Sequence, residues 1–226
     1  MRILFLTQIS PCPPSNGGAI KSYNILRHLG MHHRVSLLTF IRGEEEVGPL
    51  VEEMSAFCRR IDVCRIRRSA AINSRDAARS LVTGRSFIIA RDADVRMHEK
   101  VAEEIRAGVD LIYVDHLQMF QFVPSDAPCP VVLDQHNVEW RIIERFARTG
   151  GAFVRRCFAA LEWRKLRTWE LEACGRADLV ITVTEDDRRV LTSTGVARVK
   201  VVPLPIGVDV DRLTPVDSPP DSSRIL

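Results

Sequence analysis

The sequence of 226 residues contains no long apolar run, and this absence excludes several classes of protein. No stretch approaches the ~18 uninterrupted apolar residues that a membrane-spanning helix needs. The apolar run in the opening MRILFLTQ is too short for a signal-peptide core, and no small-residue cleavage site follows it. We therefore expect a cytoplasmic protein, either free in solution or at the inner face of the membrane.

The six cysteines include no C-x-x-C pair, and no cysteine or histidine cluster has the spacing of a zinc site. Without a secretory signal they are expected to be reduced thiols. We predict no metal site and no cofactor. The apolar fraction of 46% and the charged fraction of 27% are ordinary for a globular protein, which excludes a disordered chain, a collagen and a coiled coil.

Lysine is also scarce, because only four of the 32 basic residues are lysines. Residues 59–91 hold nine arginines and two aspartates, a net charge of +7, and residues 141–176 hold nine basic residues and four glutamates, a net charge of +5. Such stretches suit a phosphate-bearing ligand or an anionic membrane surface. No aromatic platform for RNA and no helix-turn-helix accompanies them, so we predict no nucleic-acid partner.

Short apolar runs alternate with helical stretches through most of the chain. The predicted strands are Ile3–Leu6, Val35–Phe40, Ile61–Ile66, Leu111–Val114, Val131–Leu133, Leu179–Val183 and Val199–Val202. The clearest predicted helices are Ala19–Leu29, Glu44–Phe57, Val95–Arg106, Phe153–Ala173 and Thr184–Ser193, with Gly30, Gly108 and Gly195 expected to end three of them. This alternation predicts an α/β fold with a doubly wound, mainly parallel, seven-stranded Rossmann-like sheet.

Ligands of open parallel sheets bind at the carboxyl ends of the strands, near the reversal of strand order. The loop after the first strand places Gly17 and Gly18 directly before a helix, whose free N–H groups can bind a phosphate. A tight turn is the structural alternative. The loop contains neither G-x-G-x-x-G nor a P-loop, which disfavours a dinucleotide-binding domain.

Two histidines follow strands that should end at the same edge of the sheet. His116 comes after Leu111–Val114, and His136 comes after Val131–Leu133. Either imidazole can donate to a sugar hydroxyl or a phosphate near neutral pH, or can instead cap the end of its strand. Asn137 could cap the next helix, and Glu139 could meet substrate hydroxyls or pair with Arg141–Arg145. No G-x-S-x-G elbow supports a hydrolase triad.

The last part of the chain, PLPIGVDVDRLTPVDSPPDSSRIL, is rich in proline and has little apolar periodicity. That composition is typical of a linker between domains. We predict one Rossmann-like domain at residues 1–208 and a linker at residues 209–226 that leads to a missing second domain.

The ordered set of segments resembles a known family. RILFLTQISPCPPSNGGAIKSYNILRHLG, DLIYVDH, VVLDQHNVE, WRKLRTWELEACGRADLVITVTEDDRRVL and VVPLPIGVDVDRLTP resemble the N-terminal domain of family 4 type glycosyltransferases with the GT-B fold. The similarity is greatest to bacterial sugar transferases associated with exopolysaccharide synthesis. One departure is VPLPIGVD, which has extra residues and lacks the asparagine of the family pattern V-P-N-G-V-D.

This resemblance implies a two-domain retaining enzyme that needs no metal. Its N-terminal domain binds a glycan or lipid-linked acceptor, and the missing C-terminal domain binds the nucleotide-sugar donor. Gly17 and Gly18 match the loop near the donor phosphates, and His136 matches a catalytic histidine of the cleft. The residues expected to bind acceptor or substrate are Asn16, Lys21, His116, Asn137 and Glu139.

Two other functions remain open at this stage. A sugar-nucleotide epimerase has the same two-domain architecture but acts on a nucleotide sugar alone. A non-catalytic module could use the basic stretches to bind a membrane or a polyanion. For the 226-residue chain by itself, we expect folding without sugar transfer.

Overall fold

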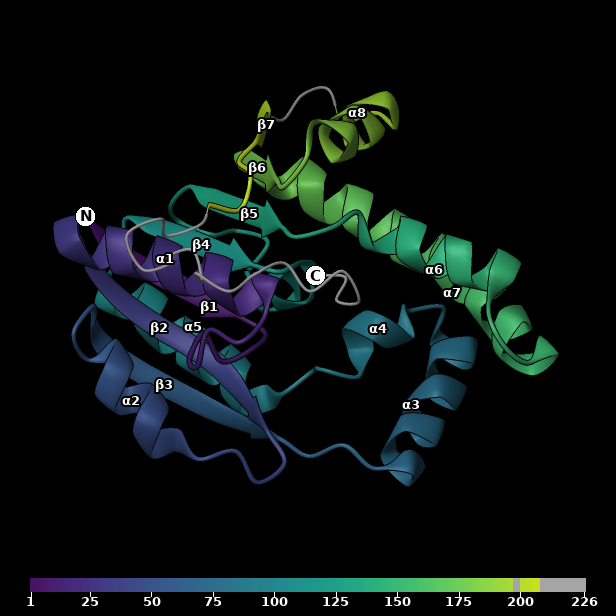
Figure 1. Ribbon diagram of the computed structural model, residues 1–226, viewed down its shortest axis with the longest axis horizontal. Helices are drawn as coiled ribbons and strands as arrows, with labels where there is room; N and C mark the ends of the chain where they lie inside the picture. Colours follow the sequence, from purple (N-terminus) through teal and green to yellow (C-terminus); the bar gives the residue numbers. More distant parts are fainter. Residues whose placement is uncertain (197–199, 208–226) are drawn as a thin grey trace, which may run out of the picture.

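Seven parallel strands form one sheet in a computed structural model that describes residues 1–196 and 200–207 (Figure 1). Their order is β3-β2-β1-β4-β5-β6-β7, so the order reverses between β1 and β4. The strands are β1 (Arg2–Thr7), β2 (Arg34–Arg42), β3 (Cys58–Ile66), β4 (Leu111–Asp115), β5 (Val131–Gln135), β6 (Leu179–Thr182) and β7 (Lys200–Pro203). The predicted fold class and all seven predicted strands are confirmed.

Helices cover both faces of this sheet. The helices are α1 (Gly17–His32), α2 (Val47–Met54), α3 (Ala70–Thr83), α4 (Phe87–Ala90), α5 (Val95–Ala107), the 3₁₀ helix η1 (Leu117–Phe122), α6 (Glu139–Thr149), α7 (Phe153–Arg176) and α8 (Glu185–Ser193). Helices α1 and α2 pack on one face, and α5, η1 and α7 pack on the other. Figure 1 shows α3 and α4 beyond the carboxyl ends of β2 and β3.

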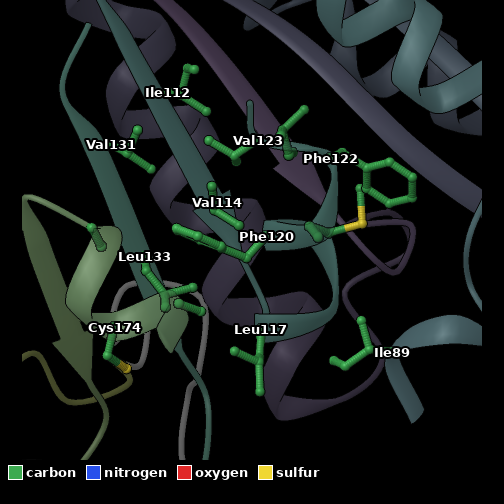
Figure 2. Close-up of a cluster of buried hydrophobic side chains, with 14 of the residues drawn as sticks. Ile89, Ile112, Val114, Leu117, Phe120, Phe122, Val123, Val131, Leu133 and Cys174 are labelled. Carbon is green, nitrogen blue, oxygen red and sulfur yellow. The ribbon is translucent and has the colours of Figure 1, made fainter. Parts of the chain in front are cut away.

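The core lies in two layers because successive side chains of a strand point to opposite faces. In β1, Ile3 and Phe5 join the cluster under α1 and α2, whereas Leu4 and Leu6 join the larger cluster on the other face. Figure 2 shows part of that larger cluster, where side chains of β4 and β5 meet those of η1. A strand that is buried on both faces is apolar throughout, which explains the uninterrupted apolar run at residues 3–6.

The prediction that Gly30 ends the first helix is wrong, because α1 continues to His32. A Cβ atom at Gly30 would lie 2.4 Å from the Phe57 carbonyl oxygen, so glycine permits close packing of α1 against the residue before β3. Gly108 and Gly195 do follow the ends of α5 and α8, with φ of 89° and 102°. Those two glycines match the expected left-handed helix ends.

The long helix α7 is confirmed, and its buried face includes acidic residues. Leu161 is 53% exposed, whereas two glutamates of α7 are buried. Glu162 Oε1 accepts hydrogen bonds from Ser86 Oγ at 2.5 Å and from Ile88 N at 3.1 Å. Eight residues further along α7, Glu170 accepts from the first two N–H groups of α6. The helix therefore caps α4 and α6 from the side, since the first N–H groups of a helix have no partner within it.

Among the described residues, no helix combines the length and the apolar character needed to cross a bilayer. The predicted linker at residues 209–226 lies outside the described residues and stays a prediction, as does the boundary at residue 208.

Candidate active site

Three loops meet where the strand order of the sheet reverses. The chain leaves β1 toward Gly17 and Gly18, leaves β4 at His116 and leaves β5 at His136. A Cβ atom placed on Gly18 would lie 3.3 Å from His136 Nδ1 and 3.7 Å from His116 Nε2. The two histidine rings stack with their centroids 3.9 Å apart. The structure thus brings together the glycine pair and both predicted histidines.

Gly17 and Gly18 form the first turn of α1. The helix begins after Asn16, whose side-chain Oδ1 accepts a hydrogen bond from Ala19 N at 3.0 Å. Asn16 therefore caps the helix, and the N–H groups of its first turn point toward the edge of the sheet that carries the histidines. A helix N-terminus in this position favours a negatively charged group.

Asp115 is the buried centre of the site. This carboxylate ends β4 and is 0% exposed. Its Oδ2 accepts hydrogen bonds from Thr7 Oγ1 at 2.6 Å and from Ser22 Oγ at 2.7 Å, and its Oδ1 lies 2.7 Å from His136 Nε2. Asp115 thereby ties β1, α1 and the loop after β5 to one another.

Burial alone would raise the pKa of Asp115, but His116 and His136 hold it well below its ordinary value. The carboxylate is therefore ionised near neutral pH, and an ionised carboxylate only accepts hydrogen bonds. It follows that His136 Nε2 carries the hydrogen that it shares with Asp115. In the neutral ring, Nδ1 is then left with a lone pair that faces the space beside Gly18.

His116 has a strained backbone, and its ring contacts Asp115 and stacks on the ring of His136. Its φ of 79° lies in the left-handed region, which costs a residue with a side chain on the order of 1 kcal/mol or more. The backbone N–H donates to Asp134 O at 3.0 Å, so the strand-capping alternative holds for the main chain. Although burial opposes a charged ring, the Asp115 carboxylate, 3.0 Å from Nδ1, raises the pKa of His116.

Glu139 is the first residue of α6 and lies close to this histidine pair. Burial raises the pKa of Glu139, and the nearby His116 and His136 oppose that rise. The alternative of pairing with Arg141–Arg145 is not seen among the described contacts of these residues. Glu139 thus supplies a second carboxyl group beside His136.

Asn137 is exposed, and it does not cap the next helix. The cap of α6 is Val138, which offers no side-chain hydrogen bond. Glu170 replaces that cap by accepting from Glu139 N at 3.1 Å and from Trp140 N at 3.0 Å. The capping prediction for Asn137 is therefore wrong, while its contact with a substrate stays a prediction.

Lys21 lies in α1 with its amine turned into the domain. It forms a buried ion pair with Asp134, which also accepts a hydrogen bond from Tyr113 OH at 2.6 Å. Lys21 is 4% exposed, and separating a buried ion pair of this kind costs about 3–5 kcal/mol. Lys21 thus links α1 to β5 in this structure, and its role in substrate binding stays a prediction.

A cleft of about 420 Å³ opens beside Asn16, between the loops that leave β1 and β2. Its lining includes Ser10, Arg42 and Glu45, which offer hydroxyl, guanidinium and carboxylate groups to a ligand. This cleft borders the glycine loop at Asn16.

Asp115, His116 and His136 also place three potential metal ligands within 4.8 Å of one another. A metal ion there would displace the hydrogen bond between His136 and Asp115. It would also compete with the hydroxyl groups of Thr7 and Ser22 for the carboxylate. The donor set therefore favours a hydrogen-bonded network over a metal centre, and a metal-independent site stays a prediction.

The comparison with known families identifies the group to which this arrangement belongs. Residues 15–212 match the family model described as Glycosyltransferase Family 4. The chain belongs to Glycosyltransferase Family 4. A search of curated protein sequences found no match.

Two solved structures with TM-scores of 0.50 or more show the same fold at low sequence identity. The N-terminal domain of Candida albicans trehalose-6-phosphate phosphatase has a TM-score of 0.52 and 16% identity, over 93% of this chain and 49% of that one. Phytolacca americana UGT2, solved with UDP-2fluoro-glucose and pterostilbene, has a TM-score of 0.50 and 9% identity, over 93% and 55%. A putative UDP-N-acetylglucosamine 2-epimerase from Listeria monocytogenes has a TM-score of 0.47 and 12% identity, over 86% and 42%. The chain spans about half the length of the solved structures it matches.

Sequence reasoning missed the central carboxylate of this family 4 domain. Asp115 stands directly before His116 in the sequence, but nothing in the local pattern shows that Thr7 and Ser22 converge on it from 93 and more residues away. The sequence did contain one indication of it. An aspartate stands in the last position of a buried strand, where an unpaired charge would destabilise the fold. Such a residue predicts partners on the neighbouring strand and helix.

Proposed function

We propose that the chain is the acceptor-side domain of a retaining glycosyltransferase. In this proposal the complete enzyme transfers a sugar from a nucleotide-sugar donor to a glycan or lipid-linked acceptor in polysaccharide biosynthesis. The donor is bound mainly by a second domain, and the Gly17-Gly18 turn faces its phosphates across the cleft. Membership of Glycosyltransferase Family 4 supports the transferase class.

One observation carries the proposal for the site. His136, fixed by its hydrogen bond to the buried Asp115, presents Nδ1 beside the N-terminus of α1. A neutral imidazole at that atom accepts a hydrogen bond from a hydroxyl of the transferred sugar. Gly18 leaves space for the hydroxyl because a side chain there would contact Nδ1.

The charges around His136 suit a reaction in which the donor phosphate leaves as an anion. The first turn of α1 offers N–H groups to the departing phosphate, and these donors are already oriented before reaction begins. His136 positions the sugar over this turn, while Asp115 keeps the ring in one tautomer. Holding the reactants in this way lowers the entropic part of the barrier.

The hairpin of α6 and α7 supports peripheral contact with an anionic membrane. The first two residues of α7, directly after the turn between the helices, have exposed apolar side chains, with Phe153 exposed at 76% and Val154 at 77%. Exposed arginines flank them, namely Arg141, Arg145, Arg155 and Arg156. Each basic residue near an anionic lipid surface contributes about 1 kcal/mol, and apolar side chains add to this by insertion.

A sugar-nucleotide epimerase is the alternative enzyme, and a non-catalytic basic module is the alternative outside enzymes. A transfer assay with the complete protein distinguishes them, using uridine and guanosine diphosphate sugars with and without glycan or lipid-linked acceptors. Sugar incorporated into an acceptor supports the proposal. Conversion of the nucleotide sugar without an acceptor supports an epimerase, and no turnover under any condition supports the binding module.

A further inference from the structure

An arginine-rich cavity of about 550 Å³ lies between α3, the end of β3 and the segment that joins α4 to α5. Arginines from each of these elements line it, namely Arg65, Arg67, Arg75, Arg79, Arg91 and Arg96. Three aspartates also contribute to the lining, so the cavity retains a net charge of +3. The cavity lies apart from the histidine pair and the Gly17-Gly18 turn.

The aspartates of the cavity are already paired. Arg75 Nη2 lies 3.2 Å from Asp76 Oδ1, and Arg96 Nη2 lies 2.7 Å from Asp94 Oδ2. The third carboxylate, Asp92, forms an ion pair with the neighbouring Arg68.

Four arginines of the cavity have no carboxylate partner among the described residues. Within residues 1–196 and 200–207, Arg67, Arg79 and Arg91 form no ion pair with a carboxylate. Arg65 is the fourth, and its guanidinium group donates to the carbonyl oxygens of Gly43 and Glu45.

A second observation points to an anionic ligand. The Nε atoms of Arg42, Arg68 and Arg91 are buried and have no hydrogen-bond partner among the described residues. A buried guanidinium group without a partner is costly, and the planar fork of arginine matches the oxygens of a phosphate. Of these three residues Arg91 lines the cavity, so an anion bound there would satisfy an N–H group that the protein leaves open.

Two residues of the cavity, Asp92 and Arg91, interact with residues near the candidate active site. Asp92 accepts a hydrogen bond from Gln8 Nε2 at 2.5 Å, directly after β1. Arg91 lies close enough to Glu139 to lower the pKa of that carboxyl group, against the larger effect of burial. Glu139 in turn lies beside the histidine pair, so a ligand anchored at Arg91 extends toward His136.

We propose that this cavity binds a phosphate or pyrophosphate group on the acceptor, so that the acceptor hydroxyl reaches the space beside Gly18 and His136. This inference rests on the proposed function, because it names the class of acceptor. According to this inference, the excess positive charge of residues 59–91 binds one phosphate-containing group and is not a diffuse surface charge.

Titration calorimetry of the 226-residue chain tests the proposal with two probes, inorganic pyrophosphate and geranyl pyrophosphate. The double variant Arg67→Gln/Arg79→Gln removes two unpaired, exposed arginines of the cavity. The control variant Arg145→Gln/Arg155→Gln removes two exposed arginines of the α6–α7 hairpin and changes the net charge equally. Thermal melts of all variants confirm that each is folded.

We expect both probes to bind the unsubstituted chain, with affinity about tenfold or more lower in the cavity variant and within about twofold in the control. Equal losses in the two variants would show a diffuse charge effect and overturn the proposal, as would no binding by the unsubstituted chain. Binding of inorganic pyrophosphate without its ester would show a site for free anions and overturn the acceptor assignment. Because the titration needs no turnover, its failure is distinguishable from a failure of sugar transfer.

Discussion

His136 Nε2 lies 2.7 Å from Asp115 Oδ1, and this contact orients the imidazole at the reversal point of the sheet. Asp115 has a fixed position because hydroxyl groups from β1 and α1 also donate to it. The opposite ring nitrogen faces Gly18, where the absence of a side chain leaves it open. Most of the predictions below concern this arrangement or the helices that support it.

The tautomer of His136 is the first prediction. Because the ionised Asp115 can only accept, the neutral ring must carry its hydrogen on Nε2. Nitrogen-15 NMR of the chain labelled at histidine should show that the neutral form of this ring has a protonated Nε2 and an unprotonated Nδ1. The opposite tautomer would mean that His136 does not present a lone pair to the cleft.

Substitution of Gly18 by alanine should reduce turnover of the complete enzyme without lowering stability. The added methyl group would lie 3.3 Å from His136 Nδ1 and would obstruct a ligand at that atom. Gly48→Ala is the matched control, since Gly48 is also the second residue of its helix and has open space around it. Steady-state kinetics and thermal melts of both variants check this.

We expect Gly18→Ala to lower kcat/KM by about tenfold or more, through a misplaced sugar, and Gly48→Ala to leave it unchanged. Equal kinetics for the two variants would indicate that no ligand approaches His136 from the side of Gly18.

Glu170 should make the stability of the domain depend on pH. Burial raises the pKa of Glu170 to about 8, against 4.5 for an exposed glutamate. Between these values the unfolded chain releases a proton that the folded chain keeps, so the free energy of unfolding falls as the pH rises. From pH 6 to pH 8 this single group lowers it by about 2 kcal/mol.

The variant Glu170→Gln removes the titration and keeps one oxygen, which can accept from either Glu139 N or Trp140 N. Urea unfolding at pH 6 and pH 8 should therefore show a larger gain in stability for this variant at the higher pH. Glu172→Gln, an exposed position on the same helix, should show no such difference. A gain that is the same at both pH values would refute the raised pKa of Glu170.

Membrane contact by the α6–α7 hairpin is a separate prediction. Phe153→Ser/Val154→Ser should reduce sedimentation of the chain with vesicles of phosphatidylglycerol, because the exposed apolar side chains at the turn are lost. Met31→Ser/Val51→Ser alters two exposed apolar residues elsewhere and serves as the control. Binding should also weaken at high salt and be absent for phosphatidylcholine vesicles. Equal binding to phosphatidylglycerol and phosphatidylcholine vesicles would contradict a contribution of the exposed arginines to membrane contact.

The strands were predictable because they are buried on both faces. A run such as residues 3–6 is apolar throughout, and its neighbours in the sequence repeat that pattern with helices between them. The helix that begins at Thr184 was likewise predicted from the sequence, and the Thr184 side chain caps it. These features depend on local residues, which is why the fold class followed from them.

Features set by distant partners were not predictable in this way. Gly30 ends no helix because Phe57 packs against it, and Asn137 caps no helix because Glu170 does so from α7. Asp115 is the centre of the site because the hydroxyl groups of Thr7 and Ser22, which are distant in the sequence, donate to it. Sequence reasoning located the two histidines at the edge of the sheet but gave no indication of the carboxylate that orients them.

Turnover of His136→Ala in the complete enzyme tests the central claim most directly. Loss of one oriented hydrogen-bonding group in a catalytic site lowers the rate by about 100-fold or more. We expect a loss of this size that exceeds any effect of the lost Asp115 contact on thermal stability, and normal turnover for His32→Ala, which alters an exposed histidine at the end of α1. A His136→Ala enzyme that melts at a lower temperature but turns over normally per folded molecule would show that His136 only supports the structure.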